Sequence, residues 1–227
     1  MVNSCFAISG LASHPFGSWR ARDNSGTFMW LRDALPKACP GVHPIIYGYD
    51  THLVGSQSFK SIEDIAIAFT SQLKAIGCSL PSAKPTVFLA HSLGGVVLKQ
   101  SLVPMARSGE WDVHLLSKIH KVVLFRVPNR GMKISHLVQM VNGQPNLSLV
   151  ERLSPHDGYL ALLDDQLAGI SFHRNMRIVS VYETHRTQLP EVQCENSSGA
   201  QIDPDVVPTG DRAWGLEAYW TTRNTCR

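Results

Sequence analysis

Short apolar runs alternate with amphipathic segments over the first 182 residues of the chain. Each apolar run has the length of one strand and few polar interruptions, which is typical of strands buried on both faces of a sheet. The runs that we predict to be strands are residues 4–9, 44–49, 86–90, 121–127 and 177–182. The segments between them carry a helical period, and strands that alternate with helices indicate a mostly parallel sheet with helices on both faces. The pattern therefore predicts an α/β fold.

The clearest predicted helix covers residues 61–77. Its apolar positions recur at steps of three and four, which places them on one face of a helix. These positions are Ile62, Ile65, Phe69, Leu73 and Ile76. Ser61 and Asp64 have the spacing of a capping box, so we expect the helix to begin there. Further predicted helices are residues 27–36 and 94–107, and Pro104 should bend or end the second of them.

The alternation is interrupted between Pro128 and Asn175. This stretch carries several short helical patterns between two predicted strands, so we expect a helical cap inserted at about residues 128–176. The whole of residues 1–188 would form one domain, which is an ordinary size for a single α/β unit. Residues 189–227 have no clear period. We expect them to form an irregular tail that lacks the usual final strand, which would leave the edge of the preceding strand partly unprotected.

Composition and charge argue against several classes of protein. Hydrophobic residues make up 44% of the chain and charged residues 17%, as in a folded soluble domain. The formal net charge of +3 is too small to favour a nucleic-acid partner. Five cysteines, never spaced as CxxC, indicate neither a disulfide framework nor a zinc site, and we expect no metal or cofactor. No segment has the length and apolar character of a transmembrane helix or the pattern of a secretory signal, so we expect an intracellular, cytoplasmic protein.

The strongest chemical signal is the sequence TVFLAHSLGG at residues 86–95. An apolar strand runs through Ala-His-Ser-Leu-Gly directly into a predicted helix. This is the pattern of a nucleophile elbow, in which a sharp strand-to-helix turn projects the serine hydroxyl above the sheet. Small residues two positions before and after the serine let the strand and the helix approach each other. We therefore predict that Ser92 is a nucleophile; the alternative is an ordinary serine at a helix N-terminus.

Two backbone amides are candidates for the oxyanion hole that such a nucleophile requires. The first is the N–H of Leu93, which opens the helix after the serine and lies at the positive end of the helix dipole. The second should come from the loop after an earlier strand. Gly10 and Leu11 follow the first predicted strand, and we predict that the N–H of Leu11 donates there. The alternative is a plain glycine turn. Tyr49, at the end of the second predicted strand, is expected to have a structural role.

Six segments carry a resemblance to a known family. In order along the chain they read GLASHPFGSW, FMWLRDALP, IIYGYDT, FLAHSLGG, VPNRGM and VYET. Over residues 5–188 the chain resembles the serine esterases and lipases related to the SERAC family, in its fungal form. The resemblance implies an α/β-hydrolase fold with Ser92 as the nucleophile, Gly10 and Leu11 in the oxyanion turn, and Glu183 as the acid of a catalytic triad. It also implies a lipid or another acyl ester as the substrate.

The chain departs from this family at two places. Relatives usually read His-Gly-Leu at the oxyanion turn, where this chain has Ser9 in place of the histidine. The family's catalytic histidine follows the acid on a later loop, whereas here only His185 follows Glu183. We therefore expect a C-terminally truncated or diverged member of the family. His185 can act as the base only if its loop folds back over Ser92 and an acidic residue of the tail, such as Asp203 or Asp205, orients the ring. The alternatives are a solvated His185 and a Glu183 carboxylate that caps nearby amides.

Three functions stay open from the sequence. The first is hydrolysis of a carboxylic ester, of the acyl-lipid type, through an acyl-enzyme at Ser92. The second, favoured by the missing histidine of the family, is a non-catalytic α/β-hydrolase domain that binds a ligand or a protein partner through the same pocket. The third is an acyltransferase or thioesterase, which uses the same acyl-serine. The fold alone does not separate these three.

Overall fold

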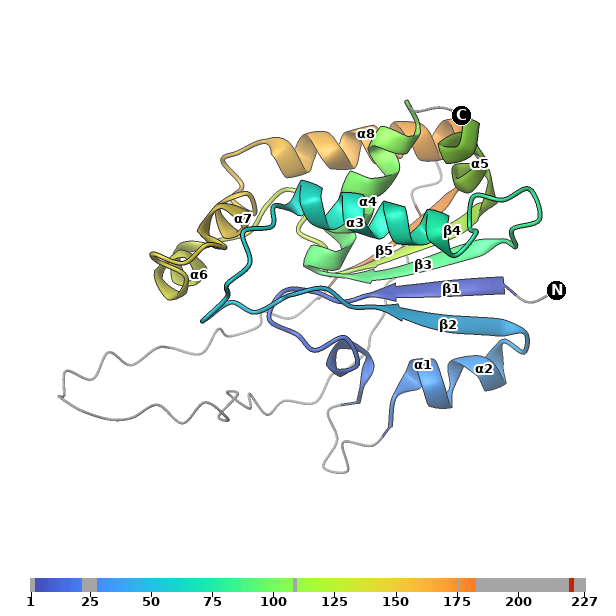
Figure 1. Cartoon of the computed structure of the whole chain (residues 1–227), viewed down its shortest axis with the longest axis horizontal. Helices are drawn as coiled ribbons and strands as arrows, with labels where there is room; N and C mark the ends of the chain where they lie inside the picture. The colour runs from blue at the N-terminus through green and yellow to red at the C-terminus, as the bar shows by residue number, and fades with distance from the viewer. Residues whose placement is uncertain (1–2, 22–27, 108–109, 175, 183–220, 223–227) are drawn as a thin grey trace.

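A central sheet with the strand order β2-β1-β3-β4-β5-β6 organises the chain (Figure 1). The computed structural model describes residues 3–21, 28–107, 110–174, 176–182 and 221–222. The strands are β1 (Asn3–Ile8), β2 (Val42–Tyr47), β3 (Thr86–His91), β4 (Ile119–Phe125), β5 (Arg177–Val181) and β6 (Thr221–Thr222). Neighbours among the first five are parallel, and β6 is antiparallel to β5. The mostly parallel sheet predicted from the apolar runs is confirmed.

Successive side chains of each strand enter two separate apolar layers. On β1, Phe6 and Ile8 belong to one layer, whereas Cys5 and Ala7 belong to the other. The two layers explain why the strands are apolar at every position rather than at every second one. Within the first layer the rings of Phe6 and Phe88 stack with their centroids 5.5 Å apart, which joins β1 to β3.

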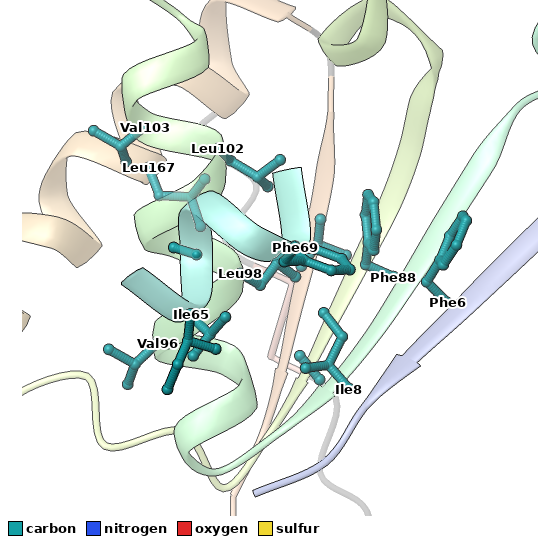
Figure 2. Packing of buried hydrophobic residues seen from close by; sticks show 14 of the residues in the cluster. Phe6, Ile8, Ile65, Phe69, Phe88, Val96, Leu98, Leu102, Val103 and Leu167 are labelled. Atoms are coloured by element: carbon teal, nitrogen blue, oxygen red, sulfur yellow. The ribbon is translucent and has the colours of Figure 1, made fainter. Parts of the chain in front are cut away.

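The helices cover the two faces unequally (Figure 1). One face carries α3 (Ile62–Ala75), α4 (Leu93–Met105), α5 (Glu110–Lys118) and α8 (Tyr159–Arg174). Figure 2 shows Ile65 and Phe69 of α3 and Leu98 of α4 in the larger core between these helices and the strands. The opposite face carries the short elements η1 (Gly17–Trp19), α1 (Trp30–Asp33) and α2 (Leu35–Ala38). There Trp19 meets Phe125 edge to face, with 6.0 Å between ring centroids.

The N-terminus of α3 carries the predicted capping box. Ser61 Oγ accepts a hydrogen bond from the N–H of Asp64 at 3.1 Å, and the Asp64 carboxylate accepts one from the N–H of Ser61 at 2.9 Å. Hydrogen bonds from the N–H and the hydroxyl of Ser61 lower the pKa of Asp64 below its ordinary value. The helix therefore begins with two of its otherwise unsatisfied donors paired.

Replacing Ser61 with alanine is expected to destabilise the protein by about 1 kcal/mol, because the N–H of Asp64 loses its acceptor. Urea unfolding followed by circular dichroism measures the change. Ser71→Ala is the matched control, since the exposed Ser71 hydroxyl donates to the carbonyl of Ile67 within the same helix and caps nothing. Equal unfolding midpoints for Ser61→Ala and Ser71→Ala would contradict the prediction.

The predicted helix at residues 27–36 is divided in the structure. The helices α1 and α2 meet at Ala34, and Pro36 lies in the first turn of α2. Proline has no N–H to donate and is best tolerated in the first turn of a helix, so Pro36 favours a new start over a continuous helix. The helix α5 was not among the predicted elements. Pro104 lies at the C-terminal end of α4, as predicted.

The stretch predicted to be a cap contains three helices, which differ in where they lie relative to the sheet. The helices α6 (Ser135–Met140) and α7 (Leu147–Glu151) lie beyond the C-terminal ends of the strands (Figure 1). In contrast, α8 lies along α4 and places Leu160, Leu163 and Leu167 in the larger core. The helix α8 is therefore the crossover between β4 and β5. The insertion is therefore shorter than residues 128–176. The leucine face of α8 packs into the core beside α4, so α8 belongs to the main domain and not to the cap.

The tail contributes one short strand. We expected this tail to lack the usual final strand and to leave the edge of β5 partly unprotected, and Thr221 and Thr222 pair antiparallel with Ser180 and Val179 of β5. The pairing covers two residues of that edge, and the lack of the usual final strand stays a prediction. The other residues between 183 and 227 lie outside the described part of the chain. Of the helices that are described, none combines the length and the apolar character needed to cross a bilayer.

Candidate active site

Ser92 lies in the tight turn between β3 and α4. Its φ of 51° and ψ of −124° are a conformation that residues with a side chain rarely adopt. Such strain costs on the order of 1–3 kcal/mol and persists only where the surrounding structure enforces it. One enforcing contact is the hydrogen bond from the N–H of Ser92 to the carbonyl of Phe125 at 2.9 Å, which ties the turn to the end of β4.

Two glycines after the serine let α4 approach the sheet closely. A Cβ on Gly94 would lie 2.4 Å from the carbonyl oxygen of Ser9 and 2.7 Å from that of Ile8. A Cβ on Gly95 would lie 2.1 Å from a methyl group of Val127. All three distances are shorter than real Cβ atoms essentially ever show, so a side chain at 94 or 95 would force the helix or its neighbours to shift.

Gly10 brings the loop after β1 against Ser92. A Cβ on Gly10 would lie 2.8 Å from the Cβ of Ser92 and 2.9 Å from the Nδ1 of His91. The backbone of Gly10 therefore borders the serine, and the role of the following Leu11 N–H as a second donor stays a prediction. Among the described residues, neither the N–H of Leu11 nor that of Leu93 has a hydrogen-bond partner.

Polar contacts hold the loop after β1 in place. The Tyr49 hydroxyl donates to the carbonyl of Ser9 at 2.8 Å, and burial raises the pKa of Tyr49 above its ordinary value, so this hydroxyl keeps its proton. The N–H of Ala12 donates to the carbonyl of Thr51 at 2.7 Å, and Thr51 Oγ1 donates to the carbonyl of Ser13 at 2.8 Å. The loop after β1 is thus fixed to the loop after β2. The structural role predicted for Tyr49 agrees with this contact.

A buried cation lies on the same helix as the candidate nucleophile. Lys99 of α4 is only 1% exposed, and its Nζ donates to Asn129 Oδ1 at 2.6 Å and to Asp164 Oδ1 at 2.5 Å. Burial lowers the pKa of Lys99, and the hydrogen bond and charge of Asp164 partly offset that effect. The cluster joins α4 to the loop after β4 and to α8. The sequence did not predict this cluster, because a lysine on a helix ordinarily lies in solvent.

The other predicted triad residues lie outside the described part of the chain. Glu183 and His185 follow Tyr182, which is the last residue of the described segment that contains β5. The parallel strand β5 ends at the same edge of the sheet as β3 and Ser92. Within the described residues, the Ser92 hydroxyl has no hydrogen bond with a histidine ring. The placement of Glu183 and His185 beside Ser92 therefore stays a prediction.

A cavity of about 400 Å³ opens between the start of α3 and α7. Its lining residues are Ser61, Ile62, Glu63, Ser148, Leu149, Glu151, Arg152 and Asp157. None of the predicted site residues that the structure describes lines it. The charged groups at its wall are already engaged, since Arg152 forms ion pairs with Glu63 at 3.2 Å and with Asp157 at 2.8 Å. Over the described residues no three metal-ligating side chains come together there or elsewhere.

Comparison with other sequences identifies relatives of the chain among curated proteins. No protein-family model matches it. Among curated proteins, it is 27% identical over 229 residues to Protein SERAC1 of Bos taurus and 24% identical over 226 residues to Protein SERAC1 of Homo sapiens. Each alignment covers 92% of this chain and 33% of the relative. The chain thus spans about a third of the length of these relatives.

Solved structures share the architecture of the chain. Phospholipase PlaB from Legionella pneumophila aligns with a TM-score of 0.56 at 13% identity, over 80% of this chain and 39% of that one. The same enzyme in complex with thio-NAD aligns with a TM-score of 0.55 at 14% identity, over 80% of this chain and 37% of that one. At such identities the likeness concerns the fold. With the parallel sheet and its flanking helices, it shows that this chain has the α/β-hydrolase-like fold that its sequence predicted.

Proposed function

We propose that the chain is a serine hydrolase that cleaves a carboxylic ester through an acyl-enzyme at Ser92. The observation that carries this proposal is the strained turn at Ser92, together with the amides of Leu11 and Leu93, which have no hydrogen-bond partner among the described residues. A serine in strained backbone geometry with N–H donors available nearby in the chain fits acyl transfer. An ordinary serine at a helix N-terminus would need neither the strain nor the close approach of Gly10.

The reaction begins when Ser92 Oγ forms a bond to the ester carbonyl carbon and its proton passes to a base. The carbonyl oxygen becomes an oxyanion, which accepts hydrogen bonds from Leu11 and Leu93. The bond from carbon to the alcohol oxygen then breaks, and the proton goes to the departing alcohol. Water attacks the acyl-serine in the second half, releasing the carboxylic acid and restoring Ser92. His185 is the proposed base and Glu183 the proposed triad acid.

The proposed substrate is an ester of the lipid type. Support comes from the similarity in fold to a phospholipase and from the resemblance to serine esterases and lipases. Apolar side chains are also exposed on the loop after β2, where Val54 is 61% and Phe59 is 83% exposed. Exposed apolar groups on this loop suit an apolar acyl chain better than a small polar ester.

Labelling with a fluorophosphonate tests the proposed nucleophile. The wild-type protein is expected to react, whereas Ser92→Ala should remain unlabelled, because the probe bonds to an activated serine oxygen. Ser71→Ala is the control, since it removes an exposed hydroxyl on α3. Thermal unfolding of all three proteins separates loss of reaction from loss of fold. Equal labelling of the wild-type protein and Ser92→Ala would refute the proposal.

A second candidate function is ligand binding without catalysis. The observation that favours it is that, among the described residues, no histidine ring forms a hydrogen bond with the Ser92 hydroxyl. A serine without a base is a weak nucleophile near neutral pH. Hydrolysis of short p-nitrophenyl esters separates the two candidates. A rate that depends on both Ser92 and His185 supports the hydrolase, and a rate equal to that of Ser92→Ala supports the binding domain.

A further inference from the structure

Ser13 is the middle member of a chain of hydroxyl hydrogen bonds in the loop after β1. Ser18 Oγ donates to Ser13 Oγ at 2.9 Å, and Ser13 Oγ donates to the carbonyl oxygen of Gly10 at 2.8 Å. A serine hydroxyl has one hydrogen to donate. Because Ser13 accepts from Ser18 on one side, its own hydrogen is directed at Gly10. Hydrogen bonds arranged in series in this way strengthen one another.

The direction of the Gly10 carbonyl fixes the direction of the Leu11 amide. The carbonyl of Gly10 and the N–H of Leu11 belong to one planar peptide, and the described residues contain no cis peptide bond. In a trans peptide these two groups point in opposite directions. With the carbonyl turned toward Ser13, the N–H is turned away from Ser13 and has no partner among the described residues. A rotated peptide would present an oxygen where a donor is needed.

The contacts around this peptide do not replace Ser13. The bond from Tyr49 holds the carbonyl of Ser9, and the bonds to and from Thr51 hold Ala12 and the carbonyl of Ser13. Among the described residues, Ser13 is the one hydrogen-bond partner of the Gly10 carbonyl. Gly10 has no side chain to resist rotation about its own bonds. The orientation of the Gly10–Leu11 peptide therefore depends on a single hydroxyl.

We propose that Ser13 is a positioning residue that keeps the Leu11 N–H available as an oxyanion donor before substrate binds. The inference rests on the proposed hydrolysis at Ser92 and adds the group that prepares its oxyanion hole. Ser13 itself touches neither the substrate nor the reacting atoms. It acts through the peptide between Gly10 and Leu11.

Kinetics of ester hydrolysis give the first test, with Ser13→Ala, Ser13→Thr and the control Ser71→Ala. Removing an oxyanion donor lowers kcat by about 10²–10³, and a donor that is only misaligned part of the time should lose less, about tenfold. The loss is expected in kcat with KM close to the wild-type value, because the oxyanion exists only beyond the ground state. Ser13→Thr keeps the hydroxyl and should restore most of kcat. A merely structural role would instead lower the unfolding temperature and the fraction of active protein.

Carbonyl NMR gives a second test that does not depend on catalysis. Gly–Leu occurs twice in the sequence, at 10–11 and 215–216, so protein with ¹³C at glycine carbonyls and ¹⁵N at leucine amides gives two correlated signals. Leu216→Met removes one of them and so assigns the other to Gly10 and Leu11. In Ser13→Ala the Gly10 carbonyl shift is expected to move upfield, toward that of a carbonyl without a strong donor. In Ser13→Thr it should stay near the wild-type position.

The two tests distinguish failure of this inference from failure of the proposed function. Wild-type protein that neither hydrolyses esters nor reacts with a fluorophosphonate refutes the function. An unchanged Gly10 carbonyl shift in Ser13→Ala overturns the inference whatever the activity of the wild-type protein. A shifted carbonyl with unaltered kcat also overturns it, because the rotated peptide would then not matter to the reaction. A shifted carbonyl with lower kcat, unchanged KM and rescue by threonine supports it.

Discussion

Gly94→Ala is expected to destabilise the folded protein by about 3 kcal/mol, at the upper end of the usual cost of overpacking. The new Cβ would meet the carbonyl oxygens of Ser9 and Ile8 rather than the end of a flexible side chain. Neither oxygen can move freely, since Ile8 belongs to β1 and the Ser9 carbonyl accepts the Tyr49 hydroxyl. The helix α4 must then shift away from β1, which separates Ser92 from Gly10. Ester hydrolysis is expected to disappear with the stability.

Denaturant unfolding and ester hydrolysis measure the two effects of Gly94→Ala. Gly169→Ala is the matched control, because Gly169 is an exposed position within α8 and a Cβ there meets nothing within 4 Å. That change should instead stabilise the protein by about 0.5–1 kcal/mol. If Gly94→Ala unfolds at the denaturant concentration of the wild-type protein, α4 does not lie as close to β1 as described here.

Asp164→Ala is expected to destabilise the protein by about 3–5 kcal/mol, because it leaves the buried ammonium of Lys99 without its anionic partner. Among the described residues, Lys99 would then keep only the amide oxygen of Asn129 as a hydrogen-bond acceptor. The measurement is the free energy of unfolding from urea titration. Arg130→Ala serves as the control for a surface ion pair, since both Arg130 and its partner Asp165 are exposed and such pairs contribute about 0–1 kcal/mol.

The double variant Lys99→Met/Asp164→Leu separates the charge from the packing. Replacing a buried ion pair by apolar residues of similar size is often neutral or stabilising, so the double variant should be far more stable than Asp164→Ala.

The pH dependence of the unfolding free energy gives a further check on Asp164→Ala. Burial lowers the pKa of Lys99 below its ordinary value of 10.5, so between the two values the unfolded chain binds more protons than the folded one. The stability of Asp164→Ala should therefore rise with pH in that range. A deficit that is independent of pH would contradict a charge effect.

Much of the fold could be predicted because its signals are local. The apolar runs, the stripe that begins at Ile62 and the capping box of Ser61 each lie within one element, and the structure has them where they were expected. The motif that predicted the turn at Ser92 also consists of residues adjacent in sequence. The helix α8 was assigned to a cap because a leucine stripe shows that one helix face is buried but does not show against which partner.

Contacts between distant residues could not be predicted. Lys99 is 30 residues from Asn129 and 65 from Asp164, so its burial depends on how α4, β4 and α8 meet. The hydrogen bonds from Ser18 to Ser13 and from Ser13 to the Gly10 carbonyl join residues that are close in sequence. They depend on the conformation of a loop, however, and the spacing of apolar residues does not predict loop conformation. Sequence motifs thus identify a candidate nucleophile more readily than the groups that hold its surroundings.

The close approach of Gly94 to the end of β1 also bears on how the chain folds. The strand β1 pairs with β3 through Ser4 and Thr86, and the turn at Ser92 is tied to the end of β4 through Phe125. Strand pairings of such large sequence separation give the topology a high contact order and a slow approach to the native state. A strained backbone at Ser92 is stable only once these long-range partners are in place. The turn therefore forms late in folding, and a nascent chain that has not yet made β4 carries this serine in relaxed geometry.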